Sequence, residues 1–270
     1  MAIKDITLGQ YFPGDSVIHR LDPRTKLIGT VLYLVTLFLV RNFTGFAFCF
    51  CFLMCLVKLS RVPFKYMCRG LKPVLFLILF TAVINLFMTP GTPIWQLGFL
   101  KIAREGIYRA AFMAIRLVLL IFGSSLLTLT TKPVALTDGL EILFRPLSRV
   151  GLPSHELAMM MTIALRFIPT LLDETDKIMK AQTARGADFE SGSLVQRAKG
   201  LIPLLVPLFV SAFRIAADLA MAMEARCYRG GEGRTRMNRM AFTKRDAAAA
   251  VVIVCFIGAV IVLGRISVLP

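Results

Sequence analysis

Long apolar runs separated by short polar segments dominate the first half of the chain. The first run extends over residues 27–57 and is interrupted only by Arg41 and Asn42. As a single helix it would be about 46 Å long, whereas the hydrocarbon core of a bilayer is about 30 Å thick. The length therefore predicts two shorter transmembrane helices that meet at Arg41-Asn42.

Three further runs have the composition of membrane spans. They cover residues 74–88, 107–131 and 247–263, and the first of them is closed by the Pro-Gly-Thr-Pro turn at 90–93. Together with the two helices before them, these runs predict an all-α integral membrane protein with about five transmembrane helices.

Two more apolar stretches, residues 155–172 and 200–213, are short for crossing a membrane. Pro203 and Pro207 also disfavour a regular helix in the second stretch. We expect both stretches to lie at the membrane surface or against other helices. The alternative is that they insert together as a hairpin.

Each of these stretches continues into a polar helix that ends in a small-Arg-small tripeptide. The tripeptides are Ala184-Arg185-Gly186 and Ala225-Arg226-Cys227. Gly186 is placed as a helix C-terminal cap, and Gly230-Gly231 is expected to end the second helix. One arginine at a helix end is explained by the helix dipole alone. Two copies at equivalent ends indicate a docking function, because an arginine fork pairs bidentately with carboxylates and the small neighbours allow close approach.

Composition supports the membrane assignment. Hydrophobic residues make up 57% of the chain, against roughly 45–50% in soluble proteins, and no acidic residue occurs between Asp22 and Glu105. The formal net charge is +16, but the basic residues flank the apolar runs, as the positive-inside rule requires. A nucleic-acid partner is therefore not expected.

The basic loop at residues 58–72 contains no acidic residue and is expected to face the cytoplasm. This orientation predicts a cytoplasmic N-terminal segment (1–26), a bundle of four membrane helices (27–131), a cytoplasmic domain with two long helices (132–246) and a final span (247–270). The C-terminus is then expected outside the cell membrane.

Catalytic, cofactor and metal sites are not expected from the sequence. The densest acidic group, Asp173, Glu174 and Asp176, lies beside lysines and has no nearby histidine. A Walker-type phosphate loop is also missing. A membrane-embedded enzyme and an autonomous channel or secondary transporter remain the alternatives to a coupling role. Arg116, inside the fourth span, is either a snorkelling residue or a functional charge.

Five methionines gather on the two long helices: Met159, Met160, Met161, Met221 and Met223. Methionine adapts to several partners, although ordinary apolar packing explains it equally well.

Several motifs in order along the chain resemble the transmembrane T component (EcfT/CbiQ family) of energy-coupling factor transporters, a branch of the ATP-binding-cassette importers. They are Leu21-Asp22-Pro23-Arg24-Thr25-Lys26, Arg166-Phe167-Ile168-Pro169 followed by Asp173-Glu174, Ala181-Gln182-Thr183-Ala184-Arg185-Gly186 and Glu224-Ala225-Arg226-Cys227-Tyr228.

The resemblance implies an L-shaped, non-catalytic coupling subunit of an importer for a micronutrient, either a vitamin or a transition-metal ion. It implies that Arg185 and Arg226, with their small neighbours, dock into two ATPase subunits. It also implies that the long helices hold a substrate-binding membrane subunit, or several interchangeable ones. The contact residues expected there are Met159, Met160, Met161, Pro169, Pro203, Pro207 and Met221.

Overall fold

The computed structural model describes residues 11–40, 42–97, 100–146, 154–187, 189, 200–230 and 240–265. The chain divides into two compact units. One comprises Gly9–Gly139 with Arg239–Pro270, and we call it the bundle. The other comprises Met1–Leu8 with Leu140–Asn238, and we call it the paired-helix unit.

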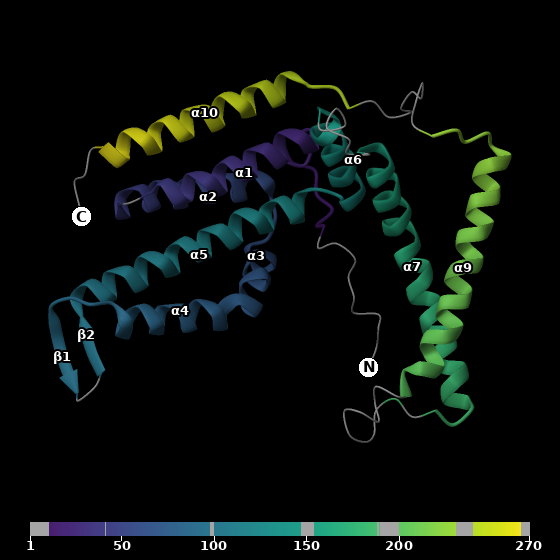
Figure 1. Ribbon diagram of the computed structural model, residues 1–270. Helices are drawn as coiled ribbons and strands as arrows, with labels where there is room; N and C mark the ends of the chain where they lie inside the picture. The colour runs from purple at the N-terminus through teal and green to yellow at the C-terminus, as the bar shows by residue number, and fades with distance from the viewer. Residues whose placement is uncertain are drawn as a thin grey trace. The chain divides into compact units, whose positions relative to one another are not determined.

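The bundle opens with the two helices that the length of the first apolar run predicts (Figure 1). Helix α1 spans Pro23–Leu39 and helix α2 spans Phe43–Ser60. Val40, which follows α1, is extended, so the chain turns there and the predicted break at Arg41-Asn42 is confirmed.

The remaining bundle elements contain the predicted spans in their predicted order, together with elements that the sequence did not predict. They are α3 (Phe64–Leu71), a short 3-10 turn η2 (Lys72–Val74), α4 (Leu75–Met88), β1 (Pro93–Leu97), β2 (Leu100–Ala103), α5 (Arg104–Thr130), α6 (Pro133–Phe144), which continues past Gly139 into the other unit, and α10 (Lys244–Arg265). The elements that were not predicted include α3, in the segment expected to be a loop, α6, and the antiparallel hairpin of β1 and β2, in which Leu97 pairs with Leu100. The fold is helical as predicted, and the hairpin connecting α4 to α5 is a local exception.

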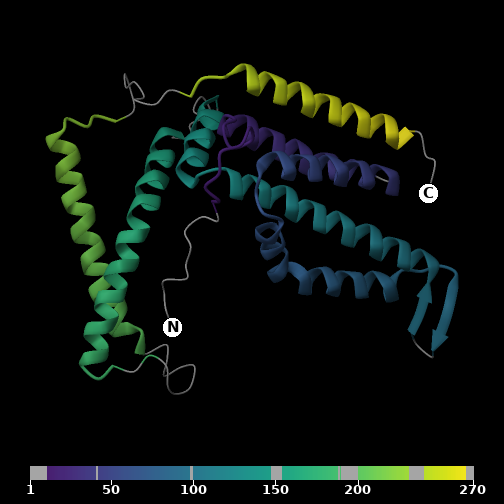
Figure 2. The same ribbon diagram turned by 180° about the vertical axis from the view of Figure 1, so that it is seen from behind.

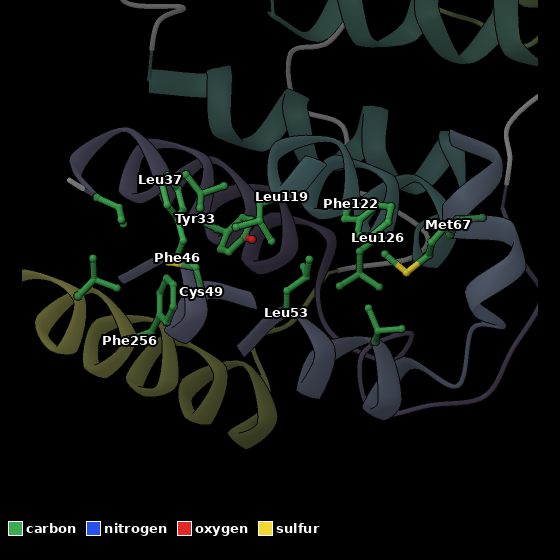
Figure 3. Packing of buried hydrophobic residues seen from close by; sticks show 14 of the residues in the cluster. Tyr33, Leu37, Phe46, Cys49, Leu53, Met67, Leu119, Phe122, Leu126 and Phe256 are labelled. Carbon is green, nitrogen blue, oxygen red and sulfur yellow. The ribbon is translucent and has the colours of Figure 1, made fainter. Parts of the chain in front are cut away.

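Helix α5 is the centre of the bundle, because it packs against α1, α2, α3 and α4, while α10 packs against α1 and α2. Figure 3 shows the core that results, with Leu37, Leu53 and Leu119 buried between the helices. Gly123 lies against the ring of Tyr33, and a Cβ atom at this position would come within 2.5 Å of the ring. The close approach of α1 and α5 therefore depends on this glycine.

The motif at the start of α1 forms a polar cluster, which we call the latch: Asp22, Arg24, Lys26 and Asp246. Asp22 caps α1 by accepting a hydrogen bond from the backbone N–H of Arg24 at 2.9 Å, and its own N–H donates to Oδ1 of Asp246 at 2.8 Å. Lys26 donates to the carbonyl of Thr130 at the end of α5, at 2.9 Å. The latch therefore joins the first turn of α1 to the end of α5 and the start of α10.

The paired-helix unit contains α7 (Ser154–Ala184) and α9 (Ile202–Ala225), which contact each other. The prediction that each apolar stretch continues into a polar helix ending at its tripeptide is confirmed. The expectation that Pro203 and Pro207 disfavour a regular helix is wrong. Pro203 lies in the first turn of α9, where backbone N–H groups have no helical partner, so only Pro207 costs a helical hydrogen bond.

Among the residues that the structure describes, six helical segments are long and apolar enough to cross a membrane, by length and composition: Phe43–Ser60, Phe64–Met88 (α3, η2 and α4 in succession), Arg104–Thr130, His155–Ala184, Ile202–Ala225 and Lys244–Arg265. The set includes α7 and α9, so our expectation that their apolar stretches lie at the membrane surface stays a prediction. Helix α1, with 17 residues, is not in this set.

Candidate functional site

The first arginine tip forms where α7 ends at Ala184. Three backbone hydrogen bonds close its last turn: Arg185 N–H to Gln182 O at 3.1 Å, Gly186 N–H to Thr183 O at 3.0 Å, and Ala187 N–H to Gln182 O at 3.0 Å. Gly186 has a φ of 90°, the left-handed conformation that favours glycine. The predicted role of Gly186 as the cap is confirmed, and it leaves Arg185 as the last residue before the chain turns away.

The second arginine tip repeats this geometry at the end of α9. Its three hydrogen bonds have the same spacing: Arg226 N–H to Met223 O at 3.2 Å, Cys227 N–H to Glu224 O at 2.9 Å, and Tyr228 N–H to Met223 O at 3.0 Å. Cys227 takes the place of Gly186 and also adopts a left-handed conformation, with a φ of 56°.

This second tip corrects the expected end of the helix. Helix α9 already ends at Ala225, before the Gly230-Gly231 pair that was expected to end it; Gly231 lies outside the described residues. In the sequence, Cys227 differs from the glycine of Ala-Arg-Gly only as a bulkier third residue. The structure shows that the backbone turn is nevertheless the same. A non-glycine residue in this conformation is strained by about 1–2 kcal/mol.

Both tips are open to a partner. The side chains of Arg185 and Arg226 are exposed, and so are their neighbours Ala184, Gly186, Ala225 and Cys227. Neither arginine forms an ion pair with a residue that the structure describes. Each tip therefore presents an arginine fork between small residues, and its donors are available for carboxylate or carbonyl oxygens.

The two tips lie at opposite ends of one crossed helix pair. Figures 1 and 2 show α7 and α9 crossing as they run in opposite directions. At the crossing, the hydroxyl of Ser211 donates to Oε1 of Glu174 at 3.4 Å. From these residues to Arg185 and Arg226 the helices extend about 16 Å and about 22 Å.

The predicted contact residues for a substrate-binding subunit lie on the same two helices. Met160, Met161, Pro169, Pro203 and Met221 are exposed, whereas Met159 and Pro207 are half-buried. The structure adds a stripe that the sequence reasoning did not identify, composed of Ile202, Val206, Phe209 and Phe213. These side chains recur at helical spacing and are all exposed, Phe213 to 74%. The spacing is present in the sequence, but Pro203 and Pro207 predict an irregular helix there, so a continuous stripe was not expected.

Arg116 is bound within the bundle. Its guanidinium donates to the carbonyl of Val40 at 3.1 Å and lies 5.1 Å from the centre of the Phe112 ring and 5.6 Å from that of Phe38. Because Val40 directly follows α1, Arg116 satisfies a carbonyl at the turn between α1 and α2. This contact agrees with a side chain that reaches toward the end of its span.

Titratable and thiol groups in the described part of the chain do not form a metal site, since no group of three or more His, Cys, Asp or Glu could hold an ion there. All six cysteines are free, and Cys49 is the buried one.

Long apolar helices around one core define a multi-pass membrane protein. Its second compact unit contains two long helices that each end at an exposed arginine. Comparison with known families gives a match to the cobalt transport protein family (CbiQ) over residues 14–237. The energy-coupling factor transporter transmembrane protein EcfT of Clostridium kluyveri is 61% identical over 258 residues, covering 94% of this chain and 96% of that protein.

Two further relatives carry the same name. The protein of Thermosediminibacter oceani is 61% identical over 247 residues, covering 92% of this chain and 93% of that protein. The protein of Bacillus subtilis is 51% identical over 245 residues, covering 90% and 92%. The chain belongs to this family and is a transmembrane component of an energy-coupling factor transporter.

Proposed function

We propose that this chain couples two ATPase subunits to a substrate-binding membrane subunit, with Arg185 and Arg226 as the two ATPase-docking residues. The observation that carries the proposal is the matched geometry of the tips. An exposed arginine precedes a left-handed residue at both helix ends, and the hydrogen bonds of the last turn have the same spacing. A helix dipole explains an arginine at one end but not this repetition of the whole turn.

The crossed arrangement supports a mechanical role for the helix pair. Each tip is fixed to a long helix, and the two helices meet near Glu174 and Ser211. When ATP binding and hydrolysis change the distance between two ATPase subunits, the tips move with them. The crossing angle of α7 and α9 then changes, and the exposed apolar faces of these helices transmit the change to a subunit that packs on them.

The apolar stripe on α9 is the proposed seat of the substrate-binding subunit, together with the contact residues predicted above. The methionines among them allow more than one such subunit to bind. The substrate class is a micronutrient, either a vitamin or a transition-metal ion, and the family description as a cobalt transport protein supports the second.

The orientation that serves this function places the beginnings of α1 and α10 and the end of α2 in the cytoplasm. The basic residues between Lys58 and Lys72 follow the end of α2, which supports this assignment. Two single variants, Asp15→Cys and Thr92→Cys, test this orientation. A membrane-impermeant thiol reagent added to whole cells should label the cysteine of Thr92→Cys and not that of Asp15→Cys.

Capture of ATPase subunits from detergent extracts tests the docking role. The wild-type chain should bring down two ATP-binding-cassette ATPases, Arg185→Glu and Arg226→Glu should each weaken the capture, and the double variant should lose it. Matched controls reverse an exposed charge next to each tip, Lys180→Glu and Arg229→Glu, and should behave as wild type. If all variants capture the ATPases equally, the docking role is contradicted and the two tripeptides serve only as helix caps.

A second pair of variants separates the subunit contact from the ATPase contact. Phe209→Ala with Phe213→Ala should weaken co-purification of a substrate-binding subunit while the ATPases are still captured. The control removes two exposed phenylalanines with the same spacing on α4, Phe76→Ala with Phe80→Ala. Recovery of one substrate-binding subunit alone from cells that express several would count against interchangeable partners.

Crosslinking tests the mechanical step. With the exposed native cysteines replaced by serine, Glu174→Cys and Ser211→Cys can be joined by a short, reducible linker. The linked protein should still capture the ATPases but lose substrate uptake, and reduction should restore uptake. Uptake that is unaffected by the linker would rule out a change in crossing angle as the coupling step.

A further inference from the structure

A basic cavity lies at the end of the bundle where α2 ends and α10 begins. It has a volume of about 650 Å³, and its lining includes Arg20, Lys58, Arg61 and Arg245, with Asp15 as its acidic residue. Asp15 is already bound to Arg20 through two hydrogen bonds of 2.6 and 2.5 Å. The other three cations form no ion pair with any residue in the described ranges. The cavity therefore carries an excess of positive charge.

The backbone fixes one of these cations in an unusual conformation. Arg61 follows the last residue of α2 with a φ of 55°, at a position where helices commonly have glycine. Its neighbours Ser60 and Val62 are buried, and the Ser60 hydroxyl donates to the carbonyl of Val57 at 2.8 Å. The turn is held from both sides, so the Arg61 side chain is directed outward at a local conformational cost.

An apolar cavity adjoins the basic one. It has a volume of about 390 Å³ and is lined by residues of α1, α2, α5 and α10, four helices that pack together in the bundle (Figure 1). Val17, Leu59 and Arg245 line both cavities, so the apolar space and the basic space share a wall. Val17 and Leu59 are each more than half exposed at this boundary.

Lys26 also lines the apolar cavity, but its ammonium group is engaged. It donates to the carbonyls of His19 at 3.0 Å and Thr130 at 2.9 Å. Lys26 thus belongs to the latch that forms the wall of the cavity. The cations open to a ligand are Lys58, Arg61 and Arg245.

We propose that the two cavities together bind one anionic phospholipid, with its phosphate at Lys58, Arg61 and Arg245 and an acyl chain in the apolar cavity. Basic pockets between transmembrane helices bind anionic headgroups, and the apolar volume falls in the usual range for small-molecule sites, about 300–1,000 Å³. A zwitterionic lipid would leave the excess positive charge uncompensated. A free phosphate would leave the apolar cavity empty.

Native mass spectrometry of the delipidated full-length protein in mild detergent tests this site. Phosphatidylglycerol is titrated against phosphatidylcholine of the same chain length, and soluble glycerol phosphate is added as a competitor. One phosphatidylglycerol should bind in preference to phosphatidylcholine, and glycerol phosphate should not displace it. Replacing Lys58, Arg61 and Arg245 by glutamine should weaken binding about a hundredfold, because each cation near an anionic lipid contributes about a fivefold change.

Control variants separate a built site from general attraction to basic protein. Lys65→Gln, Arg69→Gln and Lys72→Gln remove three exposed charges from α3 and η2, outside both cavities, and this triple variant should retain wild-type affinity. Arg61→Gly removes one cation while supplying the residue that suits its conformation, so lipid affinity should fall without loss of thermal stability.

A third variant probes the acyl chain. Ala249→Phe places a large side chain in the apolar cavity and should weaken phosphatidylglycerol binding although every cation remains. Equal binding of the two lipids, equal loss in the two triple variants, or displacement by glycerol phosphate would each overturn the proposal. None of these readouts involves the ATPases, so they are independent of the proposed coupling function.

Discussion

Replacing Arg24 by alanine removes the charged partner of a carboxylate buried in the latch. Arg24 binds Asp22 through two hydrogen bonds of 3.1 and 2.9 Å, and the side chains of the pair are only 12% and 4% exposed. The same guanidinium donates to the carbonyl of Met240 at 3.2 Å and lies 4.2 Å from the centre of the Phe242 ring. Arg24 therefore also holds the segment that leads into α10.

The expected loss of stability follows from burial. Removing one partner of a buried ion pair costs about 3–5 kcal/mol, because the remaining charge stays desolvated. We expect the lower end, about 3 kcal/mol, since Asp22 keeps its hydrogen bond from the backbone N–H of Arg24. At about 2–4 °C per kcal/mol, this loss corresponds to a fall of about 6–12 °C in melting temperature.

The chain contains a matched control in the pair of Arg20 and Asp15. It has the same bidentate geometry, but its side chains are 55% and 71% exposed. Exposed pairs contribute little to stability, because solvent screens both charges and the side chains lose conformational freedom when they pair. Arg20→Ala should therefore lower the melting temperature by a few degrees at most.

A thiol-reactive dye provides the assay. Cys49 is buried in the core, and the five other cysteines can be replaced by serine so that labelling reports the opening of the bundle. Melting of the full-length protein in detergent is then compared for Arg24→Ala, Arg24→Lys and Arg20→Ala. Melting temperatures of Arg24→Ala and Arg20→Ala within about 2 °C of each other would refute the argument that burial makes the Arg24–Asp22 pair more important for stability than the exposed Arg20–Asp15 pair.

Four other substitutions have defined outcomes. Gly186→Ala should destabilise the end of α7 by about 1 kcal/mol and Cys227→Gly should stabilise the end of α9 by a similar amount, measured by hydrogen exchange of the last-turn amides. Arg116→Leu should destabilise the bundle by about 1–3 kcal/mol, seen as a lower melting temperature, because it leaves the Val40 carbonyl without its side-chain donor. Burial is the main cause that lowers the pKa of His19 below its ordinary value of 6.5. The unfolded chain then binds the proton more readily, so stability should be complete above this value and decline as the pH falls below it, and His19→Gln should lose this pH dependence.

The first two helices of the bundle could be predicted because the thickness of the bilayer core limits the length of a single span. An apolar run of about 46 Å does not fit a core of about 30 Å, so a break at Arg41-Asn42 followed from the sequence alone. The hairpin was missed because its strands are short. In residues 93–103, two short apolar segments flank Gly98-Phe99, which is a hairpin signal, but segments of this length between two spans also fit an irregular loop.

The candidate site was predicted at the level of residue identity and not of backbone conformation. Arg185 and Arg226 stand out in the sequence, and Gly186 is recognisable as a cap from residue type. Cys227 has no such signal, because a residue other than glycine rarely adopts a left-handed conformation and its residue type does not mark it as a cap. Pro203 and Pro207 gave a wrong prediction for α9, since the effect of a proline depends on its position relative to a helix start that the sequence does not define.

The strain at the second tip bears on how the proposed docking sites work. A cysteine in a glycine-like conformation stores free energy at an exposed helix end, where no packing repays it. Because Gly186 bears no such strain in the first tip, the two turns share one geometry but differ in local stability. If the proposed docking holds, a bound ATPase subunit orders both turns, and the less stable turn at Cys227 gains more order than the turn at Gly186. Docking is therefore expected to increase the stability of the second tip more than that of the first, even though their hydrogen-bond patterns match.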